Sequence, residues 1–226
     1  MERVAYRPLR NSPRLIPLIT SIGVSFFVQN LVLGLFGPSS KSYPRLPEWL
    51  AKQRSILTFE IAGTRLMVLV VAAVSMAVLW YVVERTKTGR AMRAVAEDKE
   101  IASLMGIDVN RTIVTTFAVG GAMAGVGGIL WGLMFRSVTH MTGFLPGVKA
   151  FTSAVVGGIG NMGGAMAGGI SLGSAESIAP MLILEPLGVP GVSQLKDAVA
   201  FTVLVLVLLF KPAGLFGERL SSEDRA

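Results

Sequence analysis

RTKTGRAMRAVAEDKEIASLMGIDVNR, residues 85–111, is a charged segment between two long apolar runs. Its apolar residues recur at near-helical spacing and can dock on another surface: Ala91, Ala94, Val95, Ala102 and Met105. Glu97 and Asp98 suit a helix start, and Gly106 suits a helix end. Asp108 can cap the apolar run that follows. We therefore expect an ordered, helical segment here that can transmit motion, rather than a loop.

The composition indicates a membrane protein. The chain has 226 residues, of which 52% are hydrophobic, 15% are charged and 26 are glycines. Soluble domains contain about 25% charged residues, so lipid is the expected solvent. The absence of cysteine excludes disulfides and thiolate metal sites. The formal charge of +7 is spread among the connections, which favours anionic lipid over nucleic acid as the electrostatic partner.

Apolar runs set the expected fold class, an all-α polytopic helix bundle. Three runs can each cross about 30 Å of hydrocarbon as a helix: residues 15–36, 66–83 and 112–135. The later pattern is less regular, and its apolar runs cover residues 150–159, 162–183 and 198–210. We expect three further crossings, about six in all. One could be a half-helix or re-entrant element, because the GGIGNMGG run at residues 157–164 interrupts the apolar pattern.

The distribution of positive charge predicts the orientation. With a cytoplasmic N-terminus, thirteen of the 21 Lys and Arg residues lie in inner segments and eight in outer ones. The C-terminus and residues 85–111 then also face the cytoplasm. The expected location is the inner (plasma) membrane.

Glycines mark the second half of the chain. Small-xxx-small pairs such as Gly121 with Gly125, and Gly164 with Gly168, allow close helix packing in lipid. A second interpretation is a pair of helices that slide around a translocation pathway. Gly158 and Gly160 begin a GxGxxG pattern, but so much glycine makes a poor soluble helix after it, which argues against a dinucleotide fold. No P-loop motif is present, so any driving nucleotide would bind another subunit.

Two ionisable residues stand within the apolar half. Lys149 precedes the run at 150–159, and Glu176 interrupts the run at 162–183. A charge at membrane depth is costly and suggests a function in the pathway. The alternative is that Lys149 reaches the interface and that Glu176 accepts a hydrogen bond near a span end.

Three motifs carry a resemblance to a known family: ERVAYRPLR at 2–10, GRAMRAVAEDKEIASLMGID at 89–108 and VKAFTSAVVGGIGNMGGAMAGGISLGSAE at 148–176. Together they resemble the LivH-type permease of branched-chain amino acid ABC importers, and the similarity runs to about residue 217. The resemblance implies one permease domain over residues 1–226 and no enzymatic activity. LivH-type permeases begin with additional membrane helices before the first motif, so this chain is expected to be N-terminally short.

The resemblance also implies partners and contacts. The 85–111 segment resembles the cytoplasmic coupling helix that ABC permeases insert into their ATP-binding subunits, with contacts through Glu97, Asp98, Ala102 and Gly106. Those subunits would bind ATP and Mg²⁺, leaving this chain without a cofactor. A second, LivM-like permease and a periplasmic or extracellular substrate-binding protein complete the expected importer.

Three alternatives stay open at this point. Similar permeases carry urea or short amides in place of hydrophobic amino acids. A channel or secondary transporter would need no ATPase. A soluble nucleotide-binding enzyme would rest on the GxGxxG pattern alone.

Overall fold

The structure is a computed structural model, and it describes residues 6–9, 15–43, 53–56, 59–158, 160–180, 182, 196–211 and 214–215. The chain divides into two compact units, Met1–Thr142 and Gly143–Ala226. Within the described residues it forms eight α-helices and four short strands.

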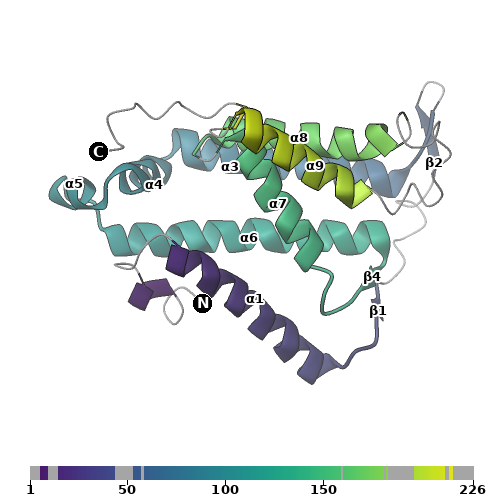
Figure 1. Cartoon of the computed structure of the whole chain (residues 1–226), viewed down its shortest axis with the longest axis horizontal. Coiled ribbons are helices and arrows are strands. Elements are labelled where there is room, and N and C mark those ends of the chain that lie inside the picture. Colours follow the sequence, from purple (N-terminus) through teal and green to yellow (C-terminus); the bar gives the residue numbers. More distant parts are fainter. Residues whose placement is uncertain are drawn as a thin grey trace. The chain divides into compact units, whose positions relative to one another are not determined.

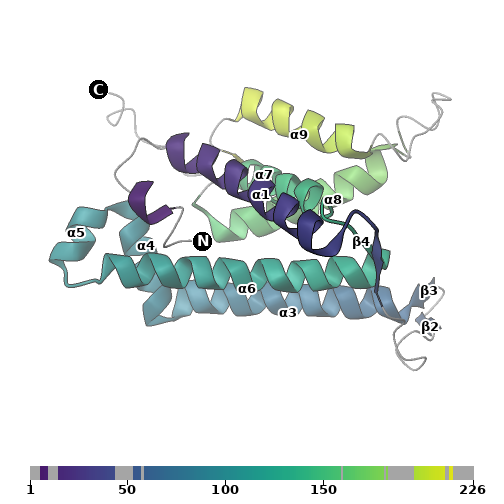
Figure 2. The same ribbon diagram turned by 90° about the horizontal axis from the view of Figure 1, so that it is seen from below.

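Three long apolar helices build the first unit: α1 (Leu15–Phe36), α3 (Gly63–Arg85) and α6 (Val109–Phe135). Each is long and apolar enough to cross a membrane, which confirms the three runs expected from the sequence. α3 and α6 lie side by side, as Figure 2 shows. α3 has no buried residue within the chain, as expected of a helix whose surface faces lipid or another membrane helix.

Short strands join the ends of these helices. β1 (Lys41–Ser42) pairs antiparallel with β4 (Ser137–Val138), which ties the connection after α1 to the end of α6. Gly132 on α6 makes this approach possible, because a Cβ there would lie only 2.6 Å from the ring of Tyr43. β2 (Gln53–Ile56) and β3 (Phe59–Ala62) form a hairpin before α3. The expected all-α fold class did not include these four short strands.

Three shorter helices build the second unit: α7 (Phe144–Gly157), α8 (Met162–Ala179) and α9 (Lys196–Phe210). Each packs against the other two, and Figure 1 shows them grouped together. The GGIGNMGG run lies where α7 gives way to α8: Gly158 and Gly160 have φ of 109° and 98°, which ends α7 and reverses the chain.

α7 begins six residues earlier than the apolar run suggested, at Phe144 instead of residue 150. Pro146 lies in its first turn, where the missing N–H has no helical partner to lose. The expectation that Lys149 precedes this helix was therefore wrong. Lys149 is part of the helix.

Backbone contact holds the α7–α8 hairpin together. A Cβ at Gly157 would collide with the backbone of Gly164, and a Cβ at Gly168 would collide with the backbone of Ser153. Only glycine lets the two helices approach this closely, which is the geometry that small residues give in lipid. Val156 on α7 and Leu172 on α8 are buried.

The chain after α9 returns to the hairpin turn. The N–H of Leu215 donates to the carbonyl of Val156 at 2.8 Å, and Gly214, with φ of 84°, lies against Gly158. The carbonyl of Val156 belongs to the last turn of α7, which has no helical partner of its own. The end of α9 and the α7–α8 turn therefore lie at the same end of this three-helix unit.

Candidate functional site

Residues 85–111, which we call the coupling segment, form two helices instead of one: α4 (Lys87–Glu97) and α5 (Lys99–Leu104). They lie beyond the shared end of α3 and α6 (Figure 2). Asp98 divides them, because its N–H donates to the carbonyl of Ala94 while its carboxylate accepts from the N–H groups of Glu100 and Ile101 at 2.7 and 3.0 Å. Asp98 thus starts a helix as expected. Glu97 also lies near that start, since it is the last residue of α4 and directly precedes this cap.

α4 is fixed to the end of α3 at three points. The hydroxyl of Thr86 accepts from the N–H of Gly89 at 3.1 Å and caps α4. Any side chain at Gly89 would collide with the backbone of Val83. The guanidinium of Arg93 donates to the carbonyl of Val83 at 2.5 Å and to the carboxylate of Glu84 at 2.9 Å. Arg93 thus binds a carbonyl that the helix end leaves open and complements its negative dipole.

α5 ends in a Schellman motif. The N–H of Gly106 donates to the carbonyl of Ser103 at 3.0 Å, and the N–H of Ile107 donates to that of Ala102 at 3.1 Å. Gly106 has φ of 81°, as this motif requires, so the expected helix end is confirmed. Asp108 then caps α6 by accepting from the N–H of Arg111 at 3.0 Å, also as expected.

Burial separates two faces of the coupling segment. Val95 and Ala102 from the expected apolar stripe are buried against the rest of the unit. Met105, from the same stripe, is exposed. It belongs to an exposed apolar tip with Ile101 and Leu104: the exposed fractions are 60% for Ile101, 85% for Leu104 and 78% for Met105. Their spacing of three and four residues places them on one side of α5.

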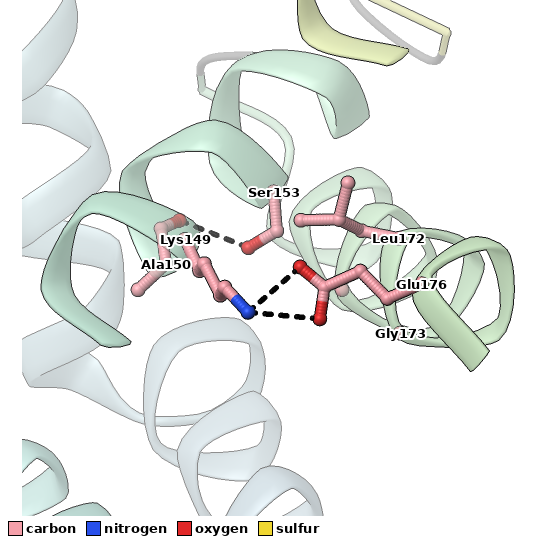
Figure 3. Close-up of a pocket in the computed structure, with 7 residues that line it drawn as sticks. Lys149, Ala150, Ser153, Leu172, Gly173 and Glu176 are labelled. Carbon is pink, nitrogen blue, oxygen red and sulfur yellow. Dashed lines mark hydrogen bonds and ion pairs between the residues drawn. The ribbon is translucent and has the colours of Figure 1, made fainter. Parts of the chain in front are cut away.

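The second unit holds a cluster of three charged side chains, which we call the ion triad. The Nζ of Lys149 on α7 lies 3.0 Å from both carboxylate oxygens of Glu176 on α8 (Figure 3) and 2.7 Å from Oδ1 of Asp197 on α9. The exposed fractions of the side chains are 27% for Lys149, 18% for Glu176 and 44% for Asp197. Each helix of the unit contributes one charge.

A cavity of about 210 Å³ opens beside the triad, between α7 and α8. Figure 3 shows the two charged ends meeting at its edge. Its lining is otherwise small or apolar: Ala150, Ser153, Gly169, Leu172 and Gly173, together with Lys149 and Glu176. A Cβ at Gly173 would meet no atom of another described segment within 4 Å, so this glycine leaves open space.

The glycines singled out by the sequence lie in different surroundings. Gly164 and Gly168 lie at the close contact of α7 with α8, and Gly158 is buried in their turn. Gly160 is exposed in that turn. Gly121 and Gly125 lie on exposed parts of α6, where an added Cβ would meet no atom of another described segment within 4 Å.

Asp197 and Arg93 are among the residues of these sites that the sequence did not single out. In the sequence, Asp197 is an ordinary acidic residue in the first turn of a helix, and no neighbouring residue indicates that it pairs with Lys149. Arg93 reads as one of several arginines in a charged segment. Only the return of α4 onto α3 brings its guanidinium to Val83 and Glu84.

Comparison with known proteins identifies the family. The family model described as "Branched-chain amino acid transport system / permease component" matches residues 5–208. The chain belongs to this permease family. It is similar to the high-affinity branched-chain amino acid transport system permease protein LivH of Escherichia coli (strain K12), with 41% identity over 96% of this chain and 68% of the relative. The permease protein BraD of Pseudomonas aeruginosa is 42% identical over 96% of this chain and 69% of its own length.

A more distant relative is the fructose import permease protein FrcC of Rhizobium meliloti, 36% identical over 45% of this chain and 27% of its own length. No solved structure matches. This protein is therefore a permease component of a branched-chain amino acid ABC transport system and not itself an enzyme, and it spans 68% and 69% of the lengths of its LivH and BraD relatives. The resemblance stated from three sequence motifs is confirmed.

Proposed function

We propose that the coupling segment transmits the motion of an ATP-binding subunit to this permease. The observation that carries the proposal is the apolar tip of α5, which is exposed although it lies in a charged segment beyond the ends of α3 and α6. Exposed apolar side chains at helical spacing are the anchors by which a helix binds a groove. The tip has no cover within the described part of the chain, and a partner subunit would supply one.

The contacts between α4 and the end of α3 support a role in transmitting motion. Gly89 allows backbone contact between α4 and α3, and Arg93 ties α4 to the last turn of α3. α4 packs against α3 and α6, and its Val95 is buried. Because packed helices move as rigid bodies, displacement of α5 would shift the ends of both long helices.

The four coupling residues inferred from the family then divide into two roles. Asp98 and Gly106 shape the ends of α5, and Ala102 anchors it, since Ala102 is buried within the chain. Glu97 is exposed and available to a partner. The direct contact would pass chiefly through Ile101, Leu104 and Met105.

We further propose six crossings with both termini in the cytoplasm. Lengths of 14, 18 and 15 residues give α7, α8 and α9 about 21, 27 and 22 Å, enough to cover most of the hydrocarbon layer. The contact of Leu215 with Val156 supports a common depth for the α7–α8 turn and the end of α9. With the orientation favoured by positive charge, that end is cytoplasmic and the ion triad lies near the outer face.

The proposed importer contains two ATP-binding subunits that bind ATP and Mg²⁺, a second LivM-like permease and a substrate-binding protein at the outer face. Branched-chain or other hydrophobic amino acids are the proposed substrates, as the names of the LivH and BraD relatives support. Urea or short amides remain the alternative within the family. Uptake that persisted without an ATP-binding subunit would favour a channel or secondary transporter instead.

Met105→Asn tests the coupling proposal, with Met141→Asn as the matched control. Both methionines are exposed, at 78% and 61%, but they lie beyond opposite ends of α6. Burying a methionine side chain contributes about 1.5–3 kcal/mol, so Met105→Asn should weaken association with the ATP-binding subunits by roughly tenfold or more. Co-purification and ATP hydrolysis by the assembled importer measure this. Equal retention of the ATP-binding subunits by both variants would exclude α5 as the contact.

A further inference from the structure

The ion triad carries one positive and two negative charges at one end of the second unit. Lys149 has three N–H donors, and Glu176 and Asp197 engage two of them. Replacing such a pair with apolar side chains often leaves stability unchanged or improved, so structural support alone is a weak reason for three charges at this position. Charges of both signs beside a cavity are better suited to a ligand that carries both signs.

Glu176 has unused capacity to bind such a ligand. Its Oε1 is buried and, although 3.0 Å from the Nζ of Lys149, has no hydrogen bond of acceptable geometry from any described residue. The ammonium of Lys149 bonds to the other oxygen, Oε2, at 3.0 Å. A buried carboxylate oxygen without a donor is costly, and a cationic donor placed at the cavity edge would satisfy it.

The cavity next to the triad is suited to a small aliphatic group. Its volume of about 210 Å³ equals the share of roughly seven water molecules in the liquid, at about 30 Å³ each. Leu172 and Ala150 supply apolar wall, and Gly169 and Gly173 leave space that any side chain would reduce. Apolar walls with a few convergent polar groups are the usual composition of a small-molecule site.

We propose that this cavity is a binding site for the zwitterion of a branched-chain amino acid. The α-ammonium is bound by Glu176 and the α-carboxylate by the remaining donor of Lys149, while the aliphatic side chain lies against Ala150 and Leu172. Asp197 is a positioning residue: it holds the Nζ of Lys149 while Glu176 turns to the ligand. The proposal rests on the transport function of the family and not on the contact between the coupling segment and an ATP-binding subunit.

Ligand analogues that lack one charge test the assignment atom by atom. The assembled importer, with its ATP-binding and second permease subunits but without the soluble binding protein, is placed in lipid nanodiscs and loaded with radiolabelled leucine. Leucinamide lacks the carboxylate, and 4-methylpentanoate lacks the ammonium. Each analogue should displace the label at least tenfold more weakly than leucine does, because a hydrogen bond to a charged group contributes this much.

Each single variant should remove the preference for leucine over one of the two analogues. In Glu176→Gln, 4-methylpentanoate should displace the label within about twofold as well as leucine does, while leucinamide should still displace it more weakly. In Lys149→Met, leucinamide should displace the label about as well as leucine does, while 4-methylpentanoate should still displace it more weakly. Lys41→Met, which removes an exposed lysine from β1 in the first unit, should change neither. Gly173→Leu should fill the cavity and abolish leucine binding. Gly23→Leu, at an equally open position on α1, should not.

The double variant Lys149→Met/Glu176→Leu separates recognition from structural support. Apolar replacement of both partners preserves packing. If the triad only supported the structure, the double variant would therefore still bind leucine more tightly than its analogues, as the unmodified importer does. The proposal predicts that leucine loses its advantage over both. Normal discrimination in the double variant, or equal displacement by all three ligands in the unmodified importer, would overturn the proposal. Neither result depends on Met105, whose replacement should alter association with the ATP-binding subunits alone.

Discussion

Cysteines placed at positions 153 and 169 should form a disulfide between α7 and α8. A Cβ at Gly169 lies 3.9 Å from the Cβ of Ser153, within the 3.5–4.5 Å that disulfides adopt. The chain contains no cysteine, so the pair Ser153→Cys/Gly169→Cys would have no competing thiol. Bridging them closes a loop of about 15 residues, for which chain entropy predicts about 3 kcal/mol of stabilisation.

Oxidation in native membranes, followed by thiol counting after denaturation, measures the cross-link. Thermal denaturation of the purified chain in detergent, oxidised against reduced, measures the stabilisation. Ser153→Cys/Gly173→Cys is the control: position 173 lies one turn further along α8, and no atom of the described helix α7 lies within 4 Å of a Cβ placed there. Equal oxidation of the two pairs, or no oxidation of the first, would refute the backbone contact from which the hairpin and the cavity are built.

Three further substitutions probe the same contacts. Gly168→Ala places a Cβ against the backbone of α7 and should destabilise the second unit by about 1–3 kcal/mol, whereas Gly173→Ala should be neutral or gain roughly 1 kcal/mol of helix propensity; thermal denaturation in detergent distinguishes them. Asp98→Ala removes the cap of α5 and should cost about 1 kcal/mol, seen as faster amide exchange at residues 100 and 101. Gly106→Ala forces an alanine to φ of 81° at roughly 1–2 kcal/mol; ATP-driven uptake should fall while membrane abundance stays constant. Uptake equal to that of the unmodified protein would argue against a role for the end of α5 in coupling.

Short-range signals made much of the fold predictable. The three long spans follow from run length and composition, because only a helix satisfies every backbone group within hydrocarbon. The caps at Asp98 and Asp108 and the positive φ of Gly106 follow from interactions within a few residues. The break of the coupling segment into two helices was missed, since Asp98 both ends α4 and begins α5.

The sequence by itself determined that this is a membrane protein, where its long helices lie, that residues 85–111 are ordered and to which family the chain belongs. Only the tertiary structure brought together Lys149, Glu176 and Asp197, which are far apart in the chain, and only it separated the buried Ala102 from the exposed Met105. The physical reason is the sequence distance over which each interaction acts. Capping and membrane insertion depend on neighbouring residues, whereas ion pairing and burial depend on which helices pack together, and that is decided by backbone contacts at glycines such as Gly157 and Gly168.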